Sequence, residues 1–213
     1  MENRLVRVLI MLACCCVGAG LYAYCNVHRD TVPRVCRLIA KAMPGCCCAA
    51  AALSCALGRG TPAMFLLAAG LALCAAADAV LEISFIPGMG VFALAHCSFI
   101  AYMCVMGVNI PTAAAVAGAW AIAISLVWVF FGAKWHIPAY FVIYACAVCG
   151  MSAVAAGRGV FALLGGLCFV ASDGMLGLRI LTGAAKGQAW YGPVLMLLYY
   201  GALFLLMLDG VLV

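Results

Sequence analysis

Two aspartates, Asp78 and Asp173, lie deep inside stretches of the sequence that are otherwise almost wholly apolar. The first is found in LLAAGLALCAAADAVLEISF and the second in FALLGGLCFVASDGMLGL. An ionisable side chain at the depth of a lipid bilayer costs a few kcal/mol, and such groups usually face a protein interior or a watery cavity. The pair therefore marks the first candidate for a functional site.

Two carboxyl groups that share a buried site can hold different protonation states, so that one donates a proton while the other stays ionised. This arrangement suits acid-catalysed hydrolysis through an oxocarbenium-like state. It suits proton relay in a transporter equally well. A third hypothesis makes both aspartates structural, and it predicts that they contact basic partners such as Lys41 or Arg179. The residues alone leave the three hypotheses open.

Other polar side chains in the apolar stretches could support the two aspartates. Glu82 follows Asp78 by four residues, so both lie on one face of a helix. Asp209 lies near the C-terminal end, and we interpret it as an end residue that reaches the interface. Anchoring at the membrane interface explains many tyrosines as well. The remaining polar residues at this depth are His96, Tyr102, Tyr144, Ser172, Tyr199 and Tyr200.

The composition indicates an integral membrane protein. The chain has 213 residues, of which 70% are hydrophobic and 8% charged, and its mean hydropathy is +1.27. A water-soluble fold could not hide this much apolar surface, whereas about 20 helical residues cross the hydrocarbon core of a bilayer. We predict one all-α, polytopic domain over residues 1–213, a single bundle with about eight transmembrane helices, near 5–25, 35–57, 63–83, 91–108, 113–131, 139–156, 160–180 and 190–211.

The ends of these stretches carry the turn signals and most of the basic residues. Pro62 suits the first turn of a helix, and Pro87-Gly88 is expected to separate the third and fourth helices. The first apolar stretch lacks a clean cleavage signal, so we expect a retained helix rather than a signal peptide or a lipoprotein modified at Cys25. One side holds slightly more positive charge and is expected to be cytoplasmic; its loops carry Arg29, Arg34, Arg37, Lys134, Arg179 and Lys186.

The composition also argues against several kinds of site. Fifteen cysteines are interpreted as small apolar residues in helix packing, and the C-x-x-C of Cys146 and Cys149 lies inside an apolar helix. No H-x-x-x-H or H-E-x-x-H spacing surrounds His96, so neither a metal nor another cofactor is expected. The net charge of +5 comes without a basic run interleaved with aromatics, so no nucleic acid is expected as a partner.

The residues around the two aspartates resemble those of the YhhN-like membrane proteins, the lysoplasmalogenase family. A-D-A-V-L-E-I followed by F-I-P-G-M-G-V-F-A-L-A-H-C-S-F-I-A-Y is similar to the first family signature. G-G-L-C-F-V-A-S-D-G-M-L-G-L-R followed by L-L-Y-Y-G-A is similar to the second. K-A-M-P at residues 41–44 resembles the Lys-Pro-x-Pro element of the family, with Ala42 in place of the first proline. Ala77 stands where the family usually has a glycine.

The resemblance implies hydrolysis of the vinyl ether bond of lysoplasmalogens to a fatty aldehyde and a glycerophospho-ethanolamine or -choline. It implies that Asp78 and Asp173 face each other across a lipid-accessible cavity as an acid/base pair. Lys41 and Arg179 are candidates for binding the substrate phosphate. The expected setting is a bacterial inner or cell membrane, the expected partner is a lysophospholipid within it, and no oligomeric state is indicated. The supporting residues are His96, Tyr199, Tyr200, Glu82 and Ser172.

Overall fold

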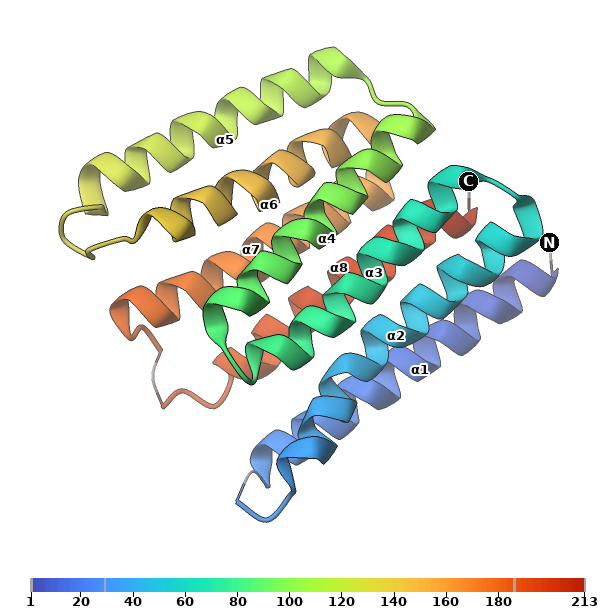
Figure 1. Cartoon of the computed structure of the whole chain (residues 1–213), viewed down its shortest axis with the longest axis horizontal. Coiled ribbons are helices and arrows are strands. Elements are labelled where there is room, and N and C mark those ends of the chain that lie inside the picture. Colours follow the sequence, from blue (N-terminus) through green and yellow to red (C-terminus); the bar gives the residue numbers. More distant parts are fainter. Residues whose placement is uncertain (1, 29, 186, 213) are drawn as a thin grey trace.

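The computed structural model of the chain describes residues 2–28, 30–185 and 187–212, which form eight α-helices and no strand. Seven of these helices, α2 to α8, are long and apolar enough to cross a membrane, whereas the apolar stretch of α1 is shorter. This confirms the predicted all-α fold of a multi-pass membrane protein. The helices, shown in Figure 1, are α1 (Glu2–Val27), α2 (Arg34–Arg59), α3 (Pro62–Leu81), α4 (Phe85–Met106), α5 (Ile110–Phe131), α6 (Ala139–Arg158), α7 (Val160–Thr182) and α8 (Tyr191–Leu212).

The helices pack as one layered bundle with α5 at its edge (Figure 1). Helix α3 lies between α2 and α4, and α8 packs on α7 as well as on α1, α2 and α3. Helix α6 joins α4, α5 and α7, while in the described part of the chain α5 contacts no helix except α6. Large apolar side chains of α5 face outward, among them Ile122, Val129 and Phe130. This exposure suits a helix that borders lipid.

The interior combines small residues with a few large rings. Ala52 and Ala56 of α2 are fully buried, as are the rings of Phe99 and Phe169. Gly166 of α7 lies so close to α6 that a Cβ atom there would be 3.0 Å from a backbone atom of the neighbouring helix. Small residues at helix contacts let the backbones approach, which is how helices associate in a bilayer.

One helix begins earlier than the sequence predicts. We expected Pro87-Gly88 to break the chain and the fourth helix to begin near residue 91, but α4 begins at Phe85. The prediction was wrong because Pro87 lies in the first turn of the helix, where its missing N–H is not needed. The break lies instead between Leu81 and Phe85, at the end of the bundle where the candidate site is found.

Candidate active site

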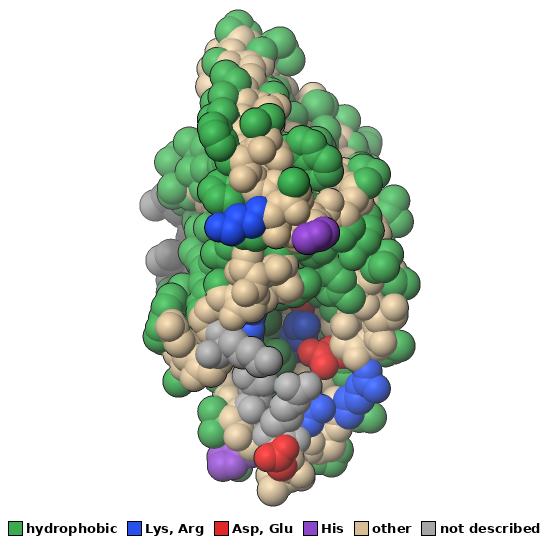
Figure 2. All heavy atoms as spheres, turned by 90° about the vertical axis from the view of Figure 1, so that its left-hand side faces the viewer, with side chains coloured by type: hydrophobic (Ala, Val, Ile, Leu, Met, Phe, Trp, Pro, Cys, Tyr) green, Lys and Arg blue, Asp and Glu red, His purple; other side chains and the backbone are tan. Residues whose placement is uncertain are grey.

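One end of the bundle, here called the polar end, brings together the last turns of α3 and α7 and the first turns of α2, α4 and α8 (Figure 1). Figure 2 views the molecule from this side and shows a hollow where basic and acidic side chains lie among apolar ones. These helices enclose a cavity of about 180 Å³, here called the polar chamber. Its lining includes Lys41, Asp78, Phe85, Ser172, Asp173 and Tyr199.

Asp78 is buried and has a cationic partner. Its side chain accepts a hydrogen bond of 2.8 Å from the Tyr199 hydroxyl, and the Lys41 Nζ lies 3.8 Å from its other oxygen. The same Nζ lies 3.4 Å from the Glu82 carboxylate, as expected if Asp78 and Glu82 share one face of the helix. Lys41 is thus placed between two carboxylates, and its charge compensates theirs in a site with little access to water.

Asp173 lies in a different electrostatic setting. The Tyr144 hydroxyl donates a hydrogen bond of 2.6 Å to its Oδ2 atom, and the His96 Nε2 is 3.8 Å from the same atom. His96 is fully buried and lies 3.3 Å from the Tyr144 hydroxyl. Among the residues that the structure describes, no lysine or arginine forms an ion pair with Asp173. The carboxyl group is therefore held by hydrogen bonds rather than by a fixed positive charge.

The two aspartates come from helices far apart in the sequence and line the same polar chamber. The hydrolase hypothesis requires this arrangement. The structural hypothesis predicts a basic partner for each aspartate. Asp78 has Lys41 as its partner, whereas no lysine or arginine of the described chain pairs with Asp173. Asp173 has instead the hydrogen bond from Tyr144, which a structural carboxylate would also accept, so the geometry is compatible with both hypotheses.

The other expected supporting residues tie the surrounding helices together. The Tyr200 hydroxyl donates 3.1 Å to the backbone carbonyl of Lys41 and so links α8 to α2. The Ser172 hydroxyl donates 3.3 Å to the carbonyl of Leu195 and links α7 to α8. These bonds position the helices that carry Lys41, Asp173 and Tyr199.

The two candidate phosphate ligands differ in where they lie. Lys41 lines the polar chamber but is already placed between Asp78 and Glu82. Arg179 is exposed and lies 5.8 Å from the centre of the Tyr191 ring, outside the set of residues that line the chamber. Arg34 is a further cation at this end, and its guanidinium donates to the carbonyl of Glu82.

The interpretation of Asp209 as an end residue at the interface was wrong. Asp209 is 3% exposed, and its Oδ2 lies 3.2 Å from the Arg158 Nε. The Tyr102 hydroxyl donates 2.8 Å to the same oxygen. The last turn of α8 faces α4 and the end of α6, so Asp209 points inward and its charge must be paired there.

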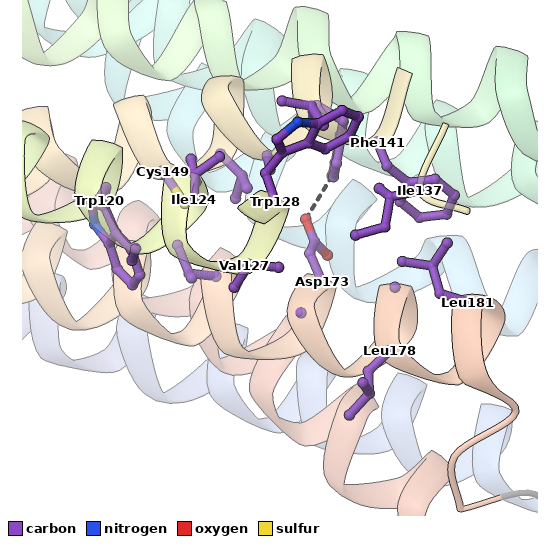
Figure 3. A pocket seen from close by; sticks show the side chains of 18 of the residues that line it. Trp120, Ile124, Val127, Trp128, Ile137, Phe141, Cys149, Asp173, Leu178 and Leu181 are labelled. Atoms are coloured by element: carbon purple, nitrogen blue, oxygen red, sulfur yellow. Dashed lines mark hydrogen bonds between the residues drawn. The ribbon is translucent and has the colours of Figure 1, made fainter. Parts of the chain in front are cut away.

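A second cavity, here called the apolar chamber, lies on the other side of Asp173. It has a volume of about 330 Å³ and is lined by α5, α6, α7 and the turn between α5 and α6. Figure 3 shows Trp120 at one end of this chamber, Ile137 and Leu181 at the other, and Asp173 between them. Of the residues that the structure describes, Asp173 alone lines both the polar and the apolar chamber.

Sequence reasoning counted Tyr144 among the polar residues but assigned it no role. No local signal distinguishes Tyr144 from a tyrosine that anchors a helix at the interface; only the packing of α6 against α4 and α7 brings its hydroxyl to Asp173. Within the described residues, no group of three or more His, Cys, Asp or Glu side chains is placed to bind a metal ion.

Comparison with known protein families gives a match that covers most of the chain. The family described as the YhhN family matches residues 36–210, which include α3, α4, α7 and nearly all of α2 and α8. The matched region contains both aspartates, Lys41, His96 and Tyr144. No curated protein and no solved structure matches this chain.

Proposed function

The chain belongs to the YhhN family, and on this premise we propose that it is an integral membrane hydrolase that cleaves the vinyl ether bond of lysoplasmalogens. The products are a fatty aldehyde and a glycerophospho-ethanolamine or -choline. One observation carries the proposal: Asp78 and Asp173 line a single cavity, and Asp173 also borders a chamber with apolar walls. A single-chain lipid has the matching polarity, because its reactive bond joins a polar head to an aliphatic chain.

In this proposal Asp173 is the general acid. It borders the apolar chamber, where the alkenyl chain lies, and Tyr144 holds its Oδ2 atom so that Oδ1 is free to carry the proton. The proton moves to the vinyl ether carbon that is not bonded to oxygen. The double bond is lost, and the positive charge is shared between the other carbon and the ether oxygen as an oxocarbenium ion.

Asp78 is the second carboxylate, and Lys41 beside it favours its ionised form. It stabilises the oxocarbenium ion and accepts a proton from the water that attacks the cationic carbon, which yields a hemiacetal. The carbon–oxygen bond to glycerol then breaks. The glycerol oxygen takes the proton from Asp78, the hemiacetal hydroxyl returns a proton to Asp173, and one water has been consumed.

We propose the inner or cell membrane of a bacterium as the setting of this reaction and a lysophospholipid dissolved in that membrane as the partner. The candidate phosphate ligands are Lys41 and Arg179, of which only Lys41 lines the polar chamber. Because Lys41 is shared with two carboxylates, its main contribution in this proposal is to hold Asp78 as an anion.

The test is an assay of aldehyde release from a lysoplasmalogen by the protein purified in detergent. Asp78→Asn and Asp173→Asn should each lower the rate by at least about a hundredfold, the usual contribution of a positioned acid or base. Asp30→Asn removes a carboxylate from an exposed loop and should leave the rate unchanged. Full activity in either site variant would contradict the two-carboxylate mechanism, and no aldehyde from the unmodified protein would favour a transporter or a structural role.

A further inference from the structure

The apolar chamber is separated from the polar chamber by side chains of α4, α6 and α7. The rings of Phe85 and Phe141 lie 5.9 Å apart, and each lines a different chamber. Farther from the polar end, Tyr144 and Asp173 form the other part of this partition. A substrate with a polar head and an aliphatic chain can therefore place each part in a chamber of matching polarity, with the bond between them at Asp173.

The apolar chamber is open between α5 and α7, where the two helices of the described chain do not pack on each other. Residues of α5 and α7 both line the chamber, yet in the described chain α5 packs closely on α6 alone, and its backbone does not approach that of α7. On this side, Trp128 of α5 is 47% exposed and Leu178 of α7 is 40% exposed. In a membrane this seam faces lipid rather than water, because the outward side chains of α5 are apolar.

We propose that the apolar chamber holds the single aliphatic chain of the substrate, which slides in from the bilayer between α5 and α7, and that Trp120 limits the length of that chain. This inference rests on the proposed function and adds where the chain lies, how it enters from the bilayer and what limits its length. The chamber volume of about 330 Å³ lies at the lower end of small-molecule sites, which measure roughly 300–1,000 Å³.

The length of the chamber supports a role for Trp120. Trp120 and Trp128 are eight residues apart on α5, which corresponds to about 12 Å along the helix at ~1.5 Å per residue. A chain that begins at Asp173 and extends away from the polar end therefore meets Trp120 at the far end of the chamber (Figure 3).

Tryptophan fluorescence can detect a chain in this chamber without any reaction. Three of the four tryptophans line it, namely Trp120, Trp128 and Trp135, so Trp190→Phe gives a background in which all emission comes from the chamber. The probe is a lysophosphatidylethanolamine with an ester-linked chain brominated near its end, because bromine quenches nearby indoles. We expect saturable quenching that an unbrominated lysolipid reverses and that falls when Trp120→Phe is added.

Two glycines provide a blocking variant and its matched control. A Cβ atom at Gly174, which lines the chamber, would meet no atom within 4 Å, so the backbone there accepts a side chain and Gly174→Leu is designed to fill the chamber. A Cβ atom at Gly118 also meets no neighbour, and this glycine lies on the exposed side of α5. Gly174→Leu should raise the half-saturating probe concentration about tenfold, because changes of a methylene group or more in an apolar pocket alter discrimination by about tenfold or more. Gly118→Leu should leave this concentration unchanged.

Two results would overturn the chamber assignment. One is quenching that the unbrominated lysolipid does not reverse, and the other is equal quenching in Gly174→Leu and Gly118→Leu. Quenching by the end-brominated probe that is unaffected by Trp120→Phe would overturn the role of Trp120. The chamber assignment and the reaction can fail separately. If the probe behaves as expected but no aldehyde is released, the reaction is wrong and the chamber stands; if aldehyde is released but Gly174→Leu binds the probe normally, the chamber is wrong and the reaction stands.

Discussion

The bundle contains two sets of buried carboxylates, one near each end, built from similar parts. At the polar end, Asp78 and Asp173 have a lysine and two tyrosines around them. At the opposite end, Asp209 has an arginine and a tyrosine, both bonded to the same carboxylate oxygen. The difference lies in the space beside them, since Asp78 and Asp173 line a cavity and Asp209 lines neither chamber.

The two sets show that burial of a carboxylate does not by itself indicate a catalytic role. Asp209 is paired with the fixed charge of Arg158 and accepts a hydrogen bond from Tyr102, so its side chain links α8 to α6 and α4. Asp173 has hydrogen-bond donors but no lysine or arginine partner in the described chain, and it borders two chambers. The set at the polar end, Asp78 and Asp173, is therefore the one with open space beside its carboxylates.

The largest effect is expected where the cation of the structural set is removed. Arg158→Met leaves the Asp209 carboxylate buried without its ion pair, which typically costs about 3–5 kcal/mol. The measurement is the thermal unfolding of the purified protein in detergent, followed by circular dichroism. The double variant Arg158→Met with Asp209→Leu should recover most of the stability, and equal melting temperatures for Arg158→Met and the unmodified protein would contradict the structural role.

Removing the cation of the candidate site should affect activity more than stability. Lys41→Met is expected to lower kcat/KM for aldehyde release by about a hundredfold, equivalent to ~2.7 kcal/mol, because Asp78 loses the positive charge that lies beside it. Its melting temperature should fall less than that of Arg158→Met, since Asp78 keeps the hydrogen bond from Tyr199 and lines a cavity. A large loss of stability with unchanged activity would make Lys41 a structural residue and weaken the comparison.

The two tyrosines that donate to carboxylates allow a matched test. Tyr144→Phe should lower kcat about tenfold, or ~1.4 kcal/mol, because Asp173 loses the donor that orients it. Tyr102→Phe should leave kcat unchanged and lower stability by about 1 kcal/mol, the usual net contribution of one hydrogen bond. The measurements are steady-state kinetics and thermal unfolding of both variants. An equal loss of kcat in Tyr144→Phe and Tyr102→Phe would remove the distinction between the two sets of carboxylates.

The smallest effect is expected at Arg179. Its exposed guanidinium can attract the substrate phosphate, but solvent-exposed charges contribute only about 0–1 kcal/mol. Arg179→Gln should therefore raise KM by no more than a few-fold at unchanged kcat, and added salt should reduce the difference. A loss of kcat comparable to that of Lys41→Met would mean that Arg179 reaches the reacting groups.

Much of the fold could be predicted from the sequence because the bilayer imposes a strict requirement. Each crossing needs about 20 apolar residues in a helix whose backbone bonds are all internal, and seven helices that meet the requirements of length and hydropathy are found near the predicted positions. The start of α4 was misplaced because a proline just before a helix and a proline in its first turn look the same in the sequence. Pro87 lies in the first turn of α4. The family signatures carry the same kind of local information, which is why the family could be identified before the fold.

The candidate site was only partly accessible to such reasoning. Asp78 and Asp173 were singled out by their depth in the sequence, and the same criterion wrongly assigned Asp209 to the interface, although it is as buried as Asp78. Tyr144 received no role because a tyrosine near a helix end has the same local sequence whether it faces lipid or a carboxylate. The apolar chamber leaves no local trace at all, because its wall residues are ordinary apolar residues of three helices.

The sequence by itself determined that this is a helical membrane protein of the YhhN family with two acidic side chains at membrane depth, since hydropathy and short motifs are properties of consecutive residues. Only the tertiary structure decided which carboxylates share a cavity, which one is paired with an arginine, and that Asp173 lies between a polar and an apolar chamber. The physical reason is that these properties depend on contacts between helices up to 159 residues apart in the chain, and the apolar patterns of those helices are compatible with many arrangements.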